Sequence, residues 1–101
     1  GIITVCSFIS PDQDIRHQVA EIIGPERFHL IYMDADLTYC KNNKPDLYQK
    51  AEDGEIENMP GVDARFDIPA EVALSLKPGE VEKSTELILN YLSRQKFFPL
   101  R

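Results

Sequence analysis

The alternation of apolar runs with helical periodicity constrains the fold of this chain more than any other feature of its sequence. The runs are rich in apolar residues and lie at Ile2–Ile9, Phe28–Asp34 and Glu71–Leu76. The first is nearly continuous and β-branched, which is typical of a strand buried on both faces of a parallel sheet. Because strands that alternate with helices form βαβ units, the pattern predicts an α/β fold.

Helical spacing follows each predicted strand. Apolar residues recur at this spacing from Ile15 to Ile23, and Gly24-Pro25 ends the pattern because Pro cannot continue a helix. Further helices are expected at about 35–41, from Lys44-Pro45 to near Gly54, and at about 80–95. The buried stripe of the last helix is expected to comprise Val81, Thr85, Ile88, Leu89 and Leu92. The polar stretch from Gly54 to Pro69 predicts a long loop, and the apolar tail Phe97–Leu100 needs a surface to pack against.

Composition and charge narrow the range of partners. The chain has 101 residues, which suits a single domain over residues 1–101, and its formal net charge is −6. Such a charge argues against a nucleic-acid binder, which needs a basic patch, and against an anionic membrane surface. No apolar run approaches a membrane span and no signal peptide is visible, which favours a cytoplasmic protein. Cys6 and Cys40 are two lone, widely spaced thiols and are expected to be reduced, with a single disulfide as the less favoured alternative.

The common glycine-rich motifs that bind nucleotide phosphates do not occur in this sequence. Neither Gly-x-x-x-x-Gly-Lys-Ser/Thr nor Gly-x-Gly-x-x-Gly is found among the 101 residues. His17 and His29 have no cysteine or carboxylate at a recognised metal spacing, so no zinc site is predicted, and a surface and a strand-face position are expected. The acidic stretch Ala51–Glu57 fits a solvated face or a metal site, and we prefer the solvated face.

The stretch Ser10-Pro11-Asp12-Gln13 has two interpretations. It combines an N-cap serine, a first-turn proline, an early acid and a capping-box glutamine, and such a cap is worth about 1 kcal/mol. It would also begin a helix at the carboxyl end of a parallel strand, where ligands bind and helix N-termini attract anions. The chemistry favours the cap, although both roles can coexist.

The order of these predicted strands, turns and helices resembles the order found in adenylylsulfate kinases. "GIITVCSFISP" is similar to the strand and Phe-Ile-Ser-Pro turn before the family's substrate-binding helix, and "GPERFHLIYMDADLTYC" to its next strand and cysteine. "LYQKAEDGEIENMPGVD" resembles the most specific block, and the last helix is also similar. The resemblance covers essentially all of this chain but only the C-terminal half of the family's domain. It implies a partial P-loop-kinase-like three-layer α/β fold, with about three mainly parallel strands flanked by helices.

The resemblance also implies an activity in sulfate assimilation. The family transfers the γ-phosphate of ATP to the 3′-hydroxyl of adenylylsulfate, uses Mg²⁺ and commonly forms dimers. Its P-loop lies in the N-terminal half, which this chain lacks, and the phosphates of ATP then have no cradle of N–H groups. We expect the chain alone to be inactive and to bind neither ATP nor Mg²⁺ tightly. The alternative is a non-catalytic pseudo-kinase module for binding or oligomerisation.

Candidate site residues follow from the same resemblance. Ser10 matches a serine that some family members carry as a phosphoserine, and it is the candidate catalytic residue. Ile9 is its neighbour in the motif, and Arg16 matches an arginine further along the family helix. Met59 stands where the family has a phenylalanine that stacks on the substrate adenine, and Gly61 is retained. Ile9, Arg16, Met59 and Gly61 are thus the candidate substrate-binding residues, and no metal ligand is implied.

Other positions depart from the family in ways that remove positive charge. Gln13 replaces an arginine, "NNKPD" replaces the basic stretch before Leu47, and Glu52 and Glu57 stand where the family often has Arg or Lys. Both nucleotides are polyanions, so each reversal could cost about 1 kcal/mol or more of binding.

The missing half has a structural consequence. The family's P-loop strand lies between the strands that match Ile2–Ile9 and Phe28–Met33. Without it, unpaired strand edges invite association. We expect the isolated chain to rearrange, to pair with another copy as a homodimer, or to need its missing N-terminal half.

Overall fold

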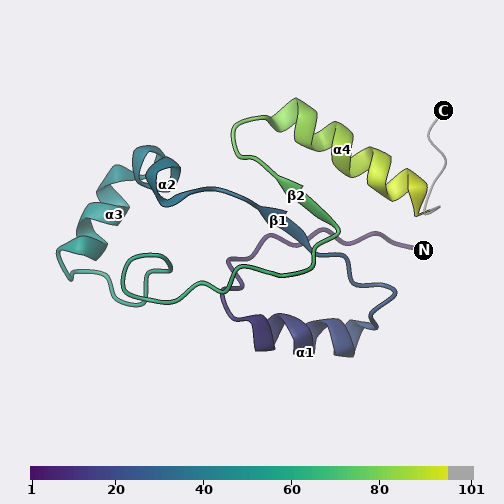
Figure 1. Cartoon of the computed structure of the whole chain (residues 1–101), viewed down its shortest axis with the longest axis horizontal. Helices are drawn as coiled ribbons and strands as arrows, with labels where there is room; N and C mark the ends of the chain where they lie inside the picture. Colours follow the sequence, from purple (N-terminus) through teal and green to yellow (C-terminus); the bar gives the residue numbers. More distant parts are fainter. Residues whose placement is uncertain (96–101) are drawn as a thin grey trace.

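The computed structural model describes residues 1–95 and shows a small α/β arrangement (Figure 1). Its elements are, in order, α1 (Gln13–Ile23), β1 (Ile31–Met33), α2 (Leu37–Asn43), α3 (Pro45–Glu52), β2 (Leu74–Leu76) and α4 (Val81–Arg94). β1 and β2 pair in parallel, from Ile31 opposite Leu74 to Met33 opposite Leu76. In Figure 1 the sheet lies between α1 and α4, while α2 and α3 lie together beyond the carboxyl end of β1. The predicted α/β class and parallel pairing are confirmed.

All four predicted helices are present, and their ends follow local chemistry. Gly24 ends α1 with φ 103°, and its N–H donates to the Ala20 carbonyl at 2.9 Å, as expected for a glycine after a helix. Pro45 is the first residue of α3, where its missing N–H costs nothing. The stretch 53–73 contains neither helix nor strand apart from an isolated bridge between Pro60 and Ala64, so the long loop is confirmed.

The strand predicted at Ile2–Ile9 is not present. Residues 1–9 form no helix or strand, and the side chains of Ile2, Val5 and Phe8 are 94%, 85% and 81% exposed. In the described part of the chain β1 pairs only with β2, so the first segment has no neighbour to complete its backbone hydrogen bonds. About three strands were predicted and two are found, and no new pairing closes the gap within residues 1–95.

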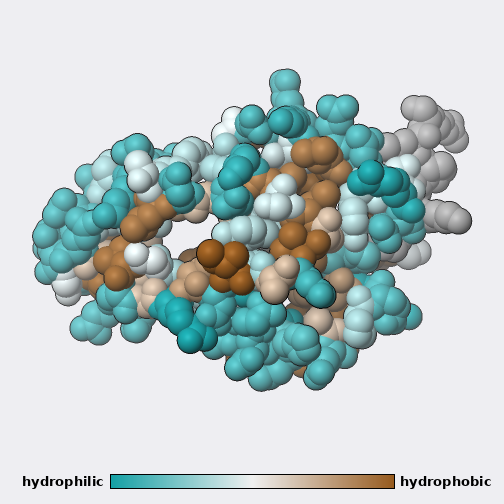
Figure 2. All heavy atoms as spheres, in the orientation of Figure 1, coloured by the Kyte–Doolittle hydropathy of each residue, from teal (hydrophilic) through white to brown (hydrophobic). Residues whose placement is uncertain are grey.

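Few apolar side chains are buried. Among residues 1–95, only Ala51 and Leu76 count as buried hydrophobic residues. Figure 2 shows apolar side chains reaching the surface across the middle of the molecule, between α1 and α4. A two-stranded sheet with so small a core is only marginally stable by itself, and exposed apolar surfaces of this kind commonly mark sites of interaction. In the described part of the chain, no helix combines the length and the apolar character that a membrane crossing requires.

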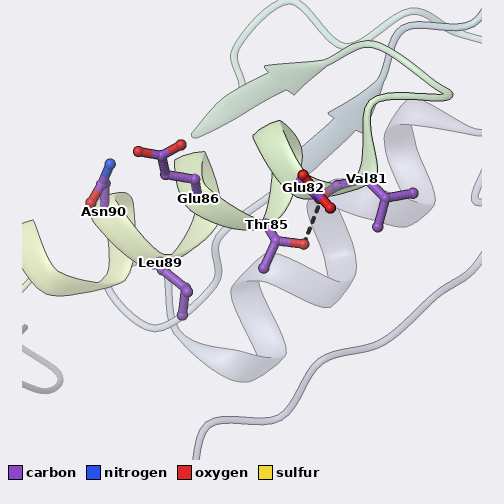
Figure 3. A pocket seen from close by; sticks show the side chains of 6 residues that line it. All are labelled: Val81, Glu82, Thr85, Glu86, Leu89 and Asn90. Carbon is purple, nitrogen blue, oxygen red and sulfur yellow. Dashed lines mark hydrogen bonds between the residues drawn. The ribbon is translucent and has the colours of Figure 1, made fainter.

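The buried stripe predicted for α4 is only partly correct. Ile88 and Leu92 are half-buried, but Val81 is 75% exposed, and Thr85 and Leu89 are exposed as well. These three exposed residues line one open side of the helix, over a shallow hollow of about 430 Å³ (Figure 3). The predicted packing of Phe97–Leu100 lies outside the described residues.

Asp12, and not Ser10, caps α1. The Oδ1 atom of Asp12 accepts from the backbone N–H groups of Asp14 and Ile15, at 2.8 and 3.1 Å. Ser10 lies two residues earlier with φ 42°, and Gln13 is the first residue of the helix. The predicted serine cap and its glutamine capping box are therefore wrong. Aspartate and serine cap helices about equally well, and the carboxylate stands nearer the helix.

Replacement of the two candidate caps tests this assignment. Asp12→Ala should lower the free energy of unfolding by about 1 kcal/mol, because two N–H groups lose their acceptor, while Ser10→Ala should change it by much less. Urea denaturation followed by circular dichroism measures both, and Asp12→Asn, which keeps a capping oxygen, is the control. A larger loss for Ser10→Ala than for Asp12→Ala would restore the serine cap.

Candidate functional site

Arg16 lies at the centre of the candidate site. It is 6% exposed, which is unusual for an arginine, and it extends from the first turns of α1. Its Nη1 atom donates to the Ser10 carbonyl, and its Nη2 atom donates to Gln13 Oε1 at 2.6 Å and to the Asp67 carbonyl at 2.5 Å. Hydrogen bonds from a charged donor are the strong ones, and here they offset the cost of burying the charge. One side chain thus ties the Ser10 turn and the long loop to α1.

An aromatic pair joins this cluster to the sheet. The guanidinium carbon of Arg16 lies 5.8 Å from the centre of the Phe66 ring, within the range of a cation–π interaction. The Phe66 ring stacks on Tyr32 of β1, with 6.4 Å between ring centres and 23° between their planes. The long loop therefore contacts both α1 and β1 at this point.

Asp67 lies at the amino end of α1. Its Oδ2 atom accepts from the Gln13 N–H at 3.0 Å, and its own N–H donates to the Pro11 carbonyl at 2.8 Å. The hydrogen bond from Arg65 is the largest cause that lowers the pKa of the Asp67 carboxyl, followed by the bond from Gln13. With Asp12, this carboxylate supplies the acceptors for the first backbone N–H groups of α1. The end of the helix that attracts anions already holds two carboxylates of this chain.

Met59 and Gly61 lie in a separate tight loop. The Asp63 carboxylate accepts from the N–H groups of Asn58 and Met59, at 2.9 and 2.6 Å. Gly61 has φ 86°, a backbone conformation that favours glycine, whereas a Cβ atom there would meet only Leu37 Cδ1 of α2, at an ordinary contact distance of 3.5 Å. This glycine is thus explained by the conformation of the backbone.

A polar pair lies where the two strands end. Asp34 follows β1 and Lys77 follows β2, with 2.5 Å between Asp34 Oδ2 and Lys77 Nζ. The hydrogen bond to this carboxylate raises the pKa of Lys77. Because the pair is largely exposed, it contributes little to stability, but it lies at the edge where ligands of α/β sheets bind.

The charges and histidines that the sequence singled out are used in other ways. Glu52 at the end of α3 forms an ion pair with Lys41 of α2, so this carboxylate joins two helices. His17 is exposed, as predicted, and His29 Nδ1 lies 2.6 Å from the Tyr91 hydroxyl of α4. Over residues 1–95, no group of three or more histidine, cysteine or acidic side chains could hold a metal ion.

The structure brings some of the predicted site residues together and not others. Ser10 and Arg16 share one cluster, and Ile9, 68% exposed, precedes them directly. Met59 and Gly61 belong to the other loop, and no hydrogen bond found within residues 1–95 joins that loop to Ser10. Sequence reasoning missed Phe66 and Asp67, because no local pattern signals contacts between residues so far apart in the chain, which for Asp67 are 51 and 54 positions.

The two parallel strands and the helices that flank them are consistent with part of a P-loop-kinase-like α/β domain. Residues 1–77 match the family model described as adenylylsulphate kinase. The chain is 40% identical to the adenylyl-sulfate kinase of Bacteroides fragilis over 103 residues, which cover 95% of this chain and 51% of that protein. It is 36% identical to that of Staphylococcus carnosus, over 95% of this chain and 50% of that protein. The chain belongs to the adenylylsulfate kinase family, and it spans about half the length of the curated relatives it matches.

The lowered pKa of Asp67 predicts how the site responds to acid. The folded state lowers this pKa below the ordinary value of 3.8, so the stabilisation is complete above that pH and is lost as the pH falls through the folded pKa. The difference in unfolding free energy between the unchanged chain and Asp67→Asn should therefore shrink between about pH 5 and pH 2. Urea denaturation at several pH values measures it, with Asp46→Asn as the control for losing one exposed carboxylate. A difference that stays constant over this range would contradict the assigned bonds.

Proposed function

We propose that this chain is the substrate-binding half of an adenylylsulfate kinase domain, which phosphorylates the 3′-hydroxyl of adenylylsulfate with ATP. Family membership supports the reaction, and the coverage of about half of each relative supports a half-domain. The reaction requires ATP and Mg²⁺, and we propose that the P-loop of the partner half binds both. A cytoplasmic location follows from the same proposal, because the reaction consumes ATP.

The geometry of the Ser10 turn is the observation that carries this proposal. The Ser10 carbonyl is held by Arg16, while the Ser10 hydroxyl makes no hydrogen bond within residues 1–95. The residue is half-buried, and the turn is fixed against α1 and the long loop. A serine whose backbone is held in place and whose hydroxyl makes no hydrogen bond within residues 1–95 suits a ligand contact or a phosphoryl group.

The remaining candidates complete the proposed substrate site. Ile9 offers an exposed apolar side chain beside Ser10, and Met59 offers a half-buried thioether that can lie against a nucleotide base. Gly61 shapes the loop that carries Met59. Arg16 belongs to the proposed site through its hydrogen bond to the Ser10 carbonyl. We propose weak binding of adenylylsulfate and no catalysis by the chain alone.

The second candidate function is a non-catalytic binding or oligomerisation module, in which a copy of the chain is the partner. The exposed apolar side chains along residues 2–9 favour it, because surfaces of this kind commonly mark protein interfaces. The two functions differ in whether a P-loop half restores phosphoryl transfer.

Ligand titration tests the substrate site. Adenylylsulfate added to the chain should bind weakly, and Ser10→Ala should weaken the binding about 5-fold to 10-fold through the loss of one hydrogen bond to a charged group. Ser7→Ala, an exposed serine on the same segment, is the matched control. Isothermal titration calorimetry measures the affinity. Equal affinities for Ser10→Ala and the unchanged chain would remove Ser10 from the site.

A complementation assay separates the two functions. The chain alone should not phosphorylate adenylylsulfate with ATP and Mg²⁺, whereas mixing it with the N-terminal half of the Bacteroides fragilis relative should restore product formation. Product from the chain alone would contradict the proposed inactivity. A mixed complex that forms without any product would favour the non-catalytic module.

A further inference from the structure

The Ser10 turn has a conformation that it cannot hold by itself. Its φ of 42° lies in the left-handed region, which residues other than glycine adopt only where the surroundings hold them. Ser10 itself is contacted by Arg16, whose Nη1 atom donates a hydrogen bond to the Ser10 carbonyl. The turn therefore depends on a side chain six positions further along the chain.

The same arginine also holds the long loop at Asp67 against the Ser10 turn. Arg16 Nη2 donates to the Asp67 carbonyl, the Asp67 N–H donates to the Pro11 carbonyl, and the Gln13 N–H donates to the Asp67 carboxylate. These bonds form a closed network between the turn, the start of α1 and the long loop. Removal of the guanidinium leaves the Ser10 and Asp67 carbonyls without their shared donor.

The guanidinium is in a poor position to meet a ligand itself. Both of its terminal nitrogens donate to groups of this chain, and its carbon lies 5.8 Å from the centre of the Phe66 ring. The remaining Nε atom is buried and has no hydrogen-bond partner within residues 1–95. An arginine that binds an anionic ligand normally presents its planar edge to that anion, and here chain carbonyls occupy this edge.

We propose that Arg16 is a positioning residue, which holds the backbone of Ser10 so that the Ser10 hydroxyl faces the substrate. This inference rests on the proposed function for the substrate, but the positioning itself can be measured without any ligand. The planar fork is essential to the role, because a lysine ammonium keeps the charge but cannot reproduce the bonds to three acceptors in one plane.

Amide hydrogen exchange of the full chain tests the positioning. In both Arg16→Lys and Arg16→Met, the backbone amides of Asp67 and Gln13 should exchange about tenfold faster or more, since the network that protects them has opened. Arg27→Met applies the same substitution to an exposed arginine and should leave these amides unchanged. Amides of Asp67 and Gln13 that stay as protected in Arg16→Lys as in the unchanged chain would overturn the proposal.

A rescue experiment separates positioning from a general loss of packing. Glycine adopts φ near 42° without strain, so Ser10→Gly in the Arg16→Met background should recover part of the lost protection at Asp67, about threefold. A general packing defect would not respond to a change at Ser10. Protection that is no better in the double variant than in Arg16→Met would count against a specific hold on this turn.

The affinity for adenylylsulfate provides the functional readout. If Arg16 acts through Ser10, Arg16→Lys and Arg16→Met should weaken binding by similar factors and leave its salt dependence unchanged. If Arg16 instead contacted the anion, Arg16→Lys would bind nearly as well as the unchanged chain and Arg16→Met would lose salt dependence, which would overturn the proposal. An unchanged chain that binds no adenylylsulfate would reject the proposed function, and amide exchange would still decide the role of Arg16.

Discussion

The buried guanidinium of Arg16 is the interaction on which the ordered part of the site depends. A charge removed from water must be compensated, and in this chain the compensation comes from acceptors in three different segments. The Ser10 turn, the start of α1 and the loop at Asp67 are therefore held at one point. The Phe66 ring extends the same cluster to Tyr32 in β1. The position of Ser10 thus depends on the Arg16 guanidinium, which binds its backbone carbonyl and not its hydroxyl.

Gln13, which replaces an arginine of the family, forms hydrogen bonds that stabilise this fold. Its side-chain oxygen accepts a hydrogen bond from Arg16, and its N–H donates to Asp67. An arginine at this position could not accept such a bond, because a guanidinium has no acceptor. Glu52 behaves in a similar way, since its carboxylate pairs with Lys41. The same replacements that remove positive charge from the proposed site also form contacts within the chain.

Much of the fold could be predicted from local chemistry, and less of the site. Gly24 and Pro45 mark helix ends for steric reasons that need no distant partner, and both were located correctly. The cap of α1 was ambiguous, because Ser10 and Asp12 are both good capping residues. Asp67 could not be predicted at all. Its bonds to the start of α1 span 54 positions, and periodicity carries no information over that distance.

The sequence by itself determined the family of this protein, the order of its helices and the parallel pairing of β1 with β2. Residue identity, spacing and helix-ending residues are sufficient for these, since each acts locally or through direct similarity. The tertiary structure alone decided that Ile2–Ile9 forms no strand and that Arg16 is buried beneath the Ser10 turn. A strand needs the hydrogen bonds of a neighbour, and a buried charge needs acceptors from other segments. Whether a neighbouring strand or distant acceptors are available depends on which segments the fold places next to one another.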